Sequence, residues 1–73
     1  MKFVMTKVRE TGNVKDPYFK VGEEYHFNGG FHIESGSSLV VGNVITSEVQ
    51  SFETRGKETL VKTKNSTYLI KEV

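Results

Sequence analysis

Two histidines and two glutamates form the best candidate for a chemical site in this sequence. Apolar and polar residues alternate on both sides of Asn28-Gly29-Gly30, and a three-residue loop with glycines is typical of a β-hairpin. We therefore expect residues 23–27 to pair with residues 31–34, which sets His26 opposite His32 on the polar face. Two imidazoles and two carboxylates on one face can complete the four ligands of a divalent metal. The candidate ligands are Glu24, His26, His32 and Glu34. The competing interpretation is that all four side chains are simply solvated.

The residue inventory argues against an enzyme and against a cofactor site. The sequence has no cysteine, no Gly-Lys-Ser/Thr phosphate loop, no Gly-x-Ser-x-Gly motif and no His-Glu-x-x-His motif. The one adjacent pair of carboxylates, Glu23 and Glu24, points to opposite faces of a strand. We expect neither catalytic activity nor a bound cofactor.

The C-terminal segment predicts a hairpin with two different faces. Pairing Lys64 with Thr67 around an Asn65-Ser66 turn places Val61, Thr63, Tyr68 and Ile70 on a core face. The other face combines apolar and basic side chains and is typical of a surface that binds a protein partner. The candidate residues for partner binding on this face are Leu60, Lys62, Lys64, Leu69 and Lys71.

Two further functions remain open for the same face. Lys62, Lys64 and Lys71 could contact the phosphates of a nucleic acid, as many small barrels do. A homodimer could instead bury Leu60 and Leu69 and enlarge a small core. Lysines on an exposed strand face also serve solubility alone, which is the simplest interpretation of these residues.

The remaining elements that must position these faces are strands. Phe3 to Arg9 predicts a first strand, although its alternation does not decide which face is buried. Glu10 to Pro17 predicts a loop. A further strand is expected from Leu39 through Ile45 to Phe52, although Ser47 and Gln50 resemble a helical capping box, so a helical turn at 47–52 is the alternative. A charged turn is expected at 53–58. The predicted fold is all-β, an SH3-like or OB-like small barrel of about five short strands.

The length and composition predict one small domain over residues 1–73 with a thin core. A domain of 73 residues buries only about 60% of the surface exposed by its unfolded chain. The core is expected to contain Tyr25, Phe27, Phe31, Ile33, Val61, Tyr68 and Ile70. The lack of cysteines, of a signal peptide and of a membrane span predicts a cytoplasmic protein.

The net charge is +1, but the charges are unevenly distributed. Residues 1–20 and residues 55–73 each contain five basic and two acidic side chains, whereas residues 21–54 contain five glutamates and no lysine or arginine. This distribution predicts a charge dipole that could orient a charged partner, or three solvated surfaces that simply differ.

Two short motifs in the C-terminal half carry a family resemblance. Thr46-Ser47-Glu48-Val49 and the segment from Thr63 to Tyr68 fit the patterns Thr-Ser-x-Val and Thr-x-Asn-Ser-x-Tyr. Over residues 44–70 the chain thereby resembles short uncharacterised proteins encoded by phages and prophages of Gram-positive bacteria. The resemblance implies a bacterial cytoplasm, or that of an infected cell, and a host or phage protein as partner. It implies no active residues.

Overall fold

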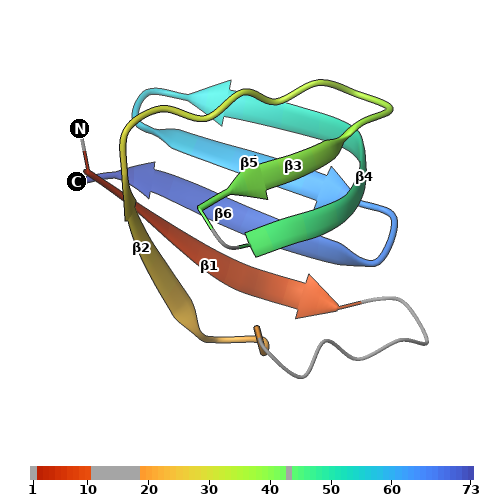
Figure 1. The fold of residues 1–73 in the computed structure, drawn as a ribbon, viewed down its shortest axis with the longest axis horizontal. Helices are drawn as coiled ribbons and strands as arrows, with labels where there is room; N and C mark the ends of the chain where they lie inside the picture. The colour runs from red at the N-terminus through yellow and green to blue at the C-terminus, as the bar shows by residue number, and fades with distance from the viewer. Residues whose placement is uncertain (1, 11–18, 43) are drawn as a thin grey trace.

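The described chain forms a nearly closed small barrel of six antiparallel strands (Figure 1). The computed structural model describes residues 2–10, 19–42 and 44–73. The strand order is β2-β1-β6-β5-β4-β3. The strands are β1 (Lys2–Glu10), β2 (Glu24–Asn28), β3 (Ser38–Val41), β4 (Val44–Arg55), β5 (Glu58–Thr63) and β6 (Ser66–Glu72). The all-β small-barrel prediction is confirmed, with six strands in place of about five.

The first strand is confirmed, and the structure decides its buried face. Met5 and Lys7 point into the barrel and are almost completely buried, whereas Val8 on the opposite face is about half exposed. The loop predicted from Glu10 to Pro17 lies outside the described residues, except that Glu10 is the last residue of β1.

The hairpin predicted for residues 23–34 is wrong. Residues 24–28 do form a strand, but β2 pairs with β1, with Phe27 opposite Phe3, and residues 31–34 are not in a strand. The Phe3 ring stacks on Phe27 at 5.2 Å between centroids, and the Phe31 ring meets Phe3 edge-on at 5.2 Å. Phe31 thus reaches the core through ring packing, so this segment buries its aromatic group without pairing as a strand.

The single strand predicted from Leu39 to Phe52 is also wrong, because the chain turns back at Gly42. Val40 pairs with Ile45 and Val41 pairs with Val44, so β3 and β4 form a hairpin. The φ angle of Gly42 is +55°, a conformation that glycine adopts without strain. The alternative of a helical turn at 47–52 fails as well, because these residues belong to β4.

The long strand β4 lies between β3 and β5 in the strand order and pairs with both. Its first half pairs with β3, and from Val49 onward it pairs with β5, with a register shift between Val49 and Ser51. Residues 53–55 continue the strand, so the charged turn predicted at 53–58 is limited to Gly56 and Lys57.

The C-terminal hairpin has the predicted faces but a different register. Lys62, not Lys64, lies opposite Thr67, and Val61 lies opposite Tyr68. The turn therefore contains residues 64–65, and Ser66 is a buried strand residue. A shift of two residues leaves each side chain on its predicted face, since the side-chain period of a strand is also two.

The core lies inside the barrel, as predicted from the sequence. Val61, Tyr68 and Ile70 are buried, and the other predicted core residues are partly buried against them. Among the described residues, the buried apolar side chains are Met5, Phe19, Leu39, Val41, Val49, Val61, Tyr68 and Ile70. No helix in the described part of the chain is long and apolar enough to cross a membrane.

Side chains close the gap between the two edge strands. Tyr25 of β2 reaches the turn between β3 and β4, where a Cβ added to Gly42 would overlap the Tyr25 hydroxyl. The Phe19 ring lies 6.5 Å from the Tyr25 ring and 5.8 Å from the Tyr68 ring, between centroids. The barrel is closed here by aromatic packing instead of a hydrogen-bonded ladder.

Candidate functional site

The predicted partner-binding residues lie mainly on the outer face of β5 and β6. Leu60 and Leu69 are directly opposite each other, and both are half-buried. The same row continues to Glu53 on β4 and to Thr6 on β1. Two leucines thus lie side by side in the middle of a four-stranded outer surface, which is here called the leucine face and comprises Glu53, Arg55, Glu58, Leu60, Lys62, Leu69 and Lys71.

Charged side chains of both signs surround these leucines. The neighbouring row contains Arg55, Glu58 and Lys71 on three adjacent strands. The Lys71 Nζ lies 3.4 Å from a Glu58 carboxylate oxygen, and the Arg55 guanidinium lies 2.9 Å from a Glu53 oxygen. Lys62 lies exposed on the other side of the leucines, and Lys64 lies exposed in the β5–β6 turn.

Two shallow clefts meet at Leu60 and Glu53. One has a volume of about 330 Å³ and is lined by Ser51, Phe52, Glu53, Leu60 and Lys62. The other, of about 280 Å³, is lined by Glu53, Arg55, Glu58, Leu60 and Leu69. Sequence reasoning missed the contributions of Glu53, Arg55 and Glu58, because residues 53–58 were expected to form a turn. Continued alternation through 51–55 is the signal that could have assigned them to a strand.

The four candidate metal ligands are not assembled into a site. Since the predicted hairpin is not formed, the histidines do not lie opposite each other across a ladder. His32 Nε2 lies 3.9 Å from a Glu34 oxygen, and both side chains are largely exposed. Within residues 2–10, 19–42 and 44–73, no three histidine or carboxylate side chains lie close enough together to hold a metal ion.

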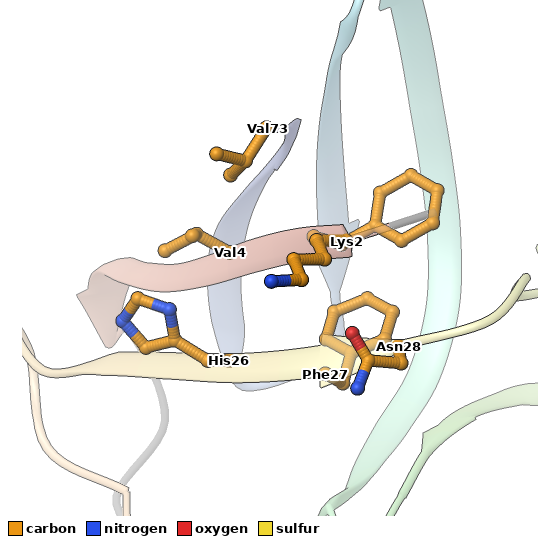
Figure 2. Close-up of a pocket in the computed structure, with 7 residues that line it drawn as sticks. Lys2, Val4, His26, Phe27, Asn28 and Val73 are labelled. Atoms are coloured by element: carbon orange, nitrogen blue, oxygen red, sulfur yellow. The ribbon is translucent and has the colours of Figure 1, made fainter.

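His26 instead lines a groove between β1 and β2 (Figure 2). The groove has a volume of about 320 Å³. Its polar lining comes from Lys2, His26 and Asn28, and its apolar lining includes Val4 and Val73. Sequence reasoning missed this groove, because it depends on the pairing of β1 with β2.

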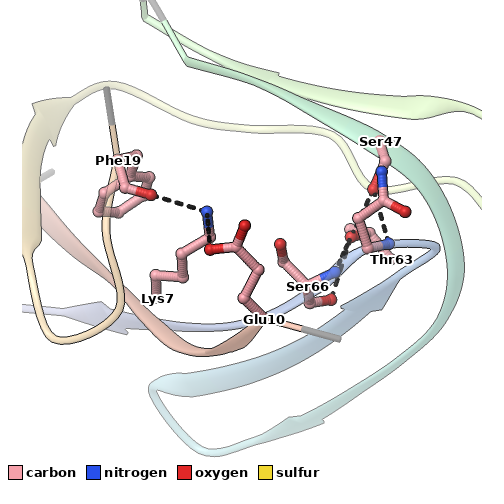
Figure 3. A network of polar contacts seen from close by, with 7 residues as sticks. Lys7, Glu10, Phe19, Ser47, Thr63 and Ser66 are labelled. Atoms are coloured by element: carbon pink, nitrogen blue, oxygen red, sulfur yellow. Dashed lines mark hydrogen bonds and ion pairs between the residues drawn. The ribbon is translucent and has the colours of Figure 1, made fainter. Parts of the chain in front are cut away.

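The two resemblance motifs meet in space through a network of hydroxyl groups (Figure 3). Ser47 Oγ donates to Thr63 Oγ1 across 2.8 Å and accepts from the backbone amide of Asn65 at 3.1 Å. Thr63 Oγ1 donates to the carbonyl oxygen of Ser66 at 3.0 Å, and Lys64 N donates to the Glu48 carbonyl. These contacts join β4 to the β5–β6 turn, so the motif residues have a structural role in this barrel.

No family model, curated protein or solved structure matches this chain. The resemblance to phage and prophage proteins therefore stays a prediction.

A second polar cluster lies inside the barrel next to this network (Figure 3). The Lys7 ammonium donates to the carbonyl oxygen of Phe19 at 2.7 Å and lies 3.4 Å from a Glu10 carboxylate oxygen. It also lies 5.9 Å from the ring centroids of Phe19 and Tyr68. Lys7 is 1% exposed, so its charge is enclosed by partners and is not presented to a ligand.

Proposed function

We propose that this chain is a non-enzymatic binding module that holds a protein partner on the leucine face. The observation that carries the proposal is the cross-strand pair Leu60 and Leu69, flanked by two clefts and surrounded by charged side chains. An apolar centre within a polar rim is the usual arrangement of a protein–protein interface. Leu60 and Leu69 would fill the centre of that interface and exclude water from it.

The charges of this face favour a protein over a nucleic acid. Glu53 and Glu58 lie among the basic side chains, and Glu58 pairs with Lys71, one of the three lysines that could contact phosphates. A phosphate backbone would be repelled by these carboxylates. A protein surface can supply both signs of charge and so complement the whole face.

The biological setting is part of the proposal. On the resemblance of residues 44–70, we place the chain among phage- or prophage-encoded accessory or regulatory proteins, with a host or phage protein as its partner in the cytoplasm of a bacterium. Lys62, Lys64 and Lys71 remain the contact residues of the alternative, a nucleic-acid-binding barrel. A homo-oligomeric structural protein that buries Leu60 and Leu69 is the other alternative.

The experiment compares two double variants in an affinity capture from bacterial lysate, run with and without nuclease. L60S/L69S removes the apolar centre, whereas the control V40S/I45S removes a different apolar cross-strand pair, which is exposed. We expect one protein to be retained by the wild-type chain and by V40S/I45S, and to be lost with L60S/L69S. Circular dichroism must show that all three chains are folded.

Each alternative has its own outcome. The chain would be a nucleic-acid-binding barrel if two results were found together. Nucleic acid would be retained with an affinity that falls steeply with salt, and the accompanying proteins would be lost on nuclease treatment. A dimer in light scattering that L60S/L69S converts to a monomer would identify a second copy of the chain as the partner.

A further inference from the structure

The strand β2 has an edge that no other described strand covers. It stands first in the strand order, and its only partner in the described chain is β1. The backbone hydrogen bonds of β1 show which residues face β2. Lys7 donates its amide to the Glu23 carbonyl at 3.4 Å and accepts from Gly22 at 2.9 Å, whereas the Lys2 carbonyl accepts from Val73 of the β6 side. The odd-numbered residues of β1 therefore bond toward β2 and the even-numbered residues toward β6.

This alternation determines which backbone groups of β2 have no partner strand in the described part of the chain. Tyr25 and Phe27 lie opposite Met5 and Phe3, so their backbone groups point toward β1. The backbone amides and carbonyls of Glu24, His26 and Asn28 consequently point to the uncovered edge. An extended peptide can bond to such a row as one more strand of the sheet.

The groove beside this edge supplies the side-chain chemistry. Lys2 lies opposite Asn28 and Val4 lies opposite His26, so the four side chains form one patch on the outer face (Figure 2). The ammonium, imidazole and amide groups all donate hydrogen bonds, and no aspartate or glutamate is among the described residues that line the groove. Lys71, which lies opposite Val4 on the β6 side, is engaged by Glu58. The groove thus favours a ligand in which a carboxylate side chain lies next to an apolar side chain.

We propose that the free edge of β2 binds an extended peptide segment with a carboxylate side chain, which lies in the groove against Lys2 and His26. The residue of an added strand that lies opposite His26 would have its Cβ about 5 Å away. An aspartate or glutamate at that position extends toward the Lys2 ammonium and the His26 imidazole, and Val4 lies beside these groups in the groove. This site is separate from the leucine face and does not depend on the proposed function.

The test selects binders to the full chain from a displayed library of random hexapeptides. We expect enrichment of aspartate and glutamate among the selected sequences. A selected peptide, added to the isotope-labelled protein, is expected to shift the amide resonances of Glu24, His26 and Asn28.

Binding is expected to weaken about tenfold in K2Q/H26Q, because charge-assisted hydrogen bonds are lost. It should be unchanged in K20Q/H32Q, which alters the same residue types at exposed positions outside the groove. N-methylation of the peptide backbone at alternate residues should abolish binding in one of the two registers.

Other results would overturn the assignment. Selection of no peptide, selection without acidic enrichment, or equal binding by K2Q/H26Q would each remove it. Salt-sensitive binding of oligothymidylate at the same amides would assign the edge to nucleic acid instead. A dimer with β2 at its interface would make a second copy the occupant. Since L60S/L69S leaves this edge intact, its peptide binding shows whether the edge site and the leucine face fail separately.

Discussion

The buried ammonium of Lys7 donates a 2.7 Å hydrogen bond to the carbonyl oxygen of Phe19, twelve residues away in the sequence. This bond connects β1 to Phe19, which precedes β2 in the sequence. The ring of Phe19 stacks on Tyr68 of β6, so the same residue also completes the core. A carbonyl, a carboxylate and two aromatic rings surround this charged group inside the small barrel and stabilise it.

Replacing Lys7 with methionine should destabilise the fold by about 1–3 kcal/mol, because the buried Phe19 carbonyl loses its partner while the apolar volume is kept. Urea denaturation measures the loss. The matched control is Lys62→Met on the exposed outer face, for which we expect a change below about 0.5 kcal/mol. Equal stability of Lys7→Met and the wild-type chain would mean that apolar packing replaces the ammonium without cost.

Gly42→Ala should cost more stability than Gly56→Ala. Both glycines have a positive φ angle, +55° and +59°. Alanine in this left-handed conformation should lower the free energy of unfolding by about 1–2 kcal/mol at each position. Only at Gly42 does the new methyl group also overlap the Tyr25 hydroxyl, whereas nothing lies within 4 Å at Gly56. Thermal or urea unfolding of the two variants isolates the cost of the overlap.

Tyr25→Phe should recover about half of that additional cost in the Gly42→Ala background, since it removes the overlapping hydroxyl. The double-mutant cycle of Gly42→Ala with Tyr25→Phe measures the recovery. Strictly additive losses would show that the side chain of Tyr25 does not close the barrel against this turn.

The hydroxyl network between β4 and the β5–β6 turn should contribute measurably to stability. Thr63→Val leaves the amide of Ser66 and the hydroxyl of Ser47 without their partner, so we expect a loss of about 1–3 kcal/mol. Ser47→Ala should cost about 1 kcal/mol. Ser51→Ala, on the exposed part of β4, serves as the control. A network without effect on the unfolding free energy would contradict the structural role assigned to these motif residues.

The two faces of β1 should respond differently to truncation. Met5→Ala empties a buried position and should cost about 2–5 kcal/mol, enough to unfold much of a domain of this size. Val8→Ala, on the face that is about half exposed, should cost less than about 1 kcal/mol. The fraction folded by circular dichroism distinguishes these cases, and similar losses at both positions would contradict the assigned faces.

Local patterns predicted the fold class and much of the core. Alternation in 59–73 identified Val61, Tyr68 and Ile70 as buried, and the error of two residues in the hairpin register changed no face. The outward position of Leu60 and Leu69 followed from the same alternation. The identity of the strand that pairs with residues 24–28 did not follow, because a glycine-rich loop suits a local hairpin as well as a crossing to β3.

The candidate sites also differ in whether their residues come from one hairpin or from strands distant in the sequence. Leu60, Lys62, Leu69 and Lys71 belong to one hairpin, so the period of two in a strand was enough to gather them. The charges contributed by β4 and the groove formed by Lys2 and His26 depend on contacts between strands distant in the sequence, which no local pattern encodes. The histidine pair failed for the same reason.

By itself, the sequence determined that this chain forms strands, which residues of the C-terminal hairpin are buried, and which catalytic motifs it lacks. Only the tertiary structure decided that β1 lies between β2 and β6, that Lys7 is buried, and that Ser47 meets Thr63. The physical reason is that side-chain alternation specifies a face within one strand. The choice of neighbouring strand is instead made by the packing of the whole barrel, in which the rings of Phe3, Phe19 and Tyr68 take part.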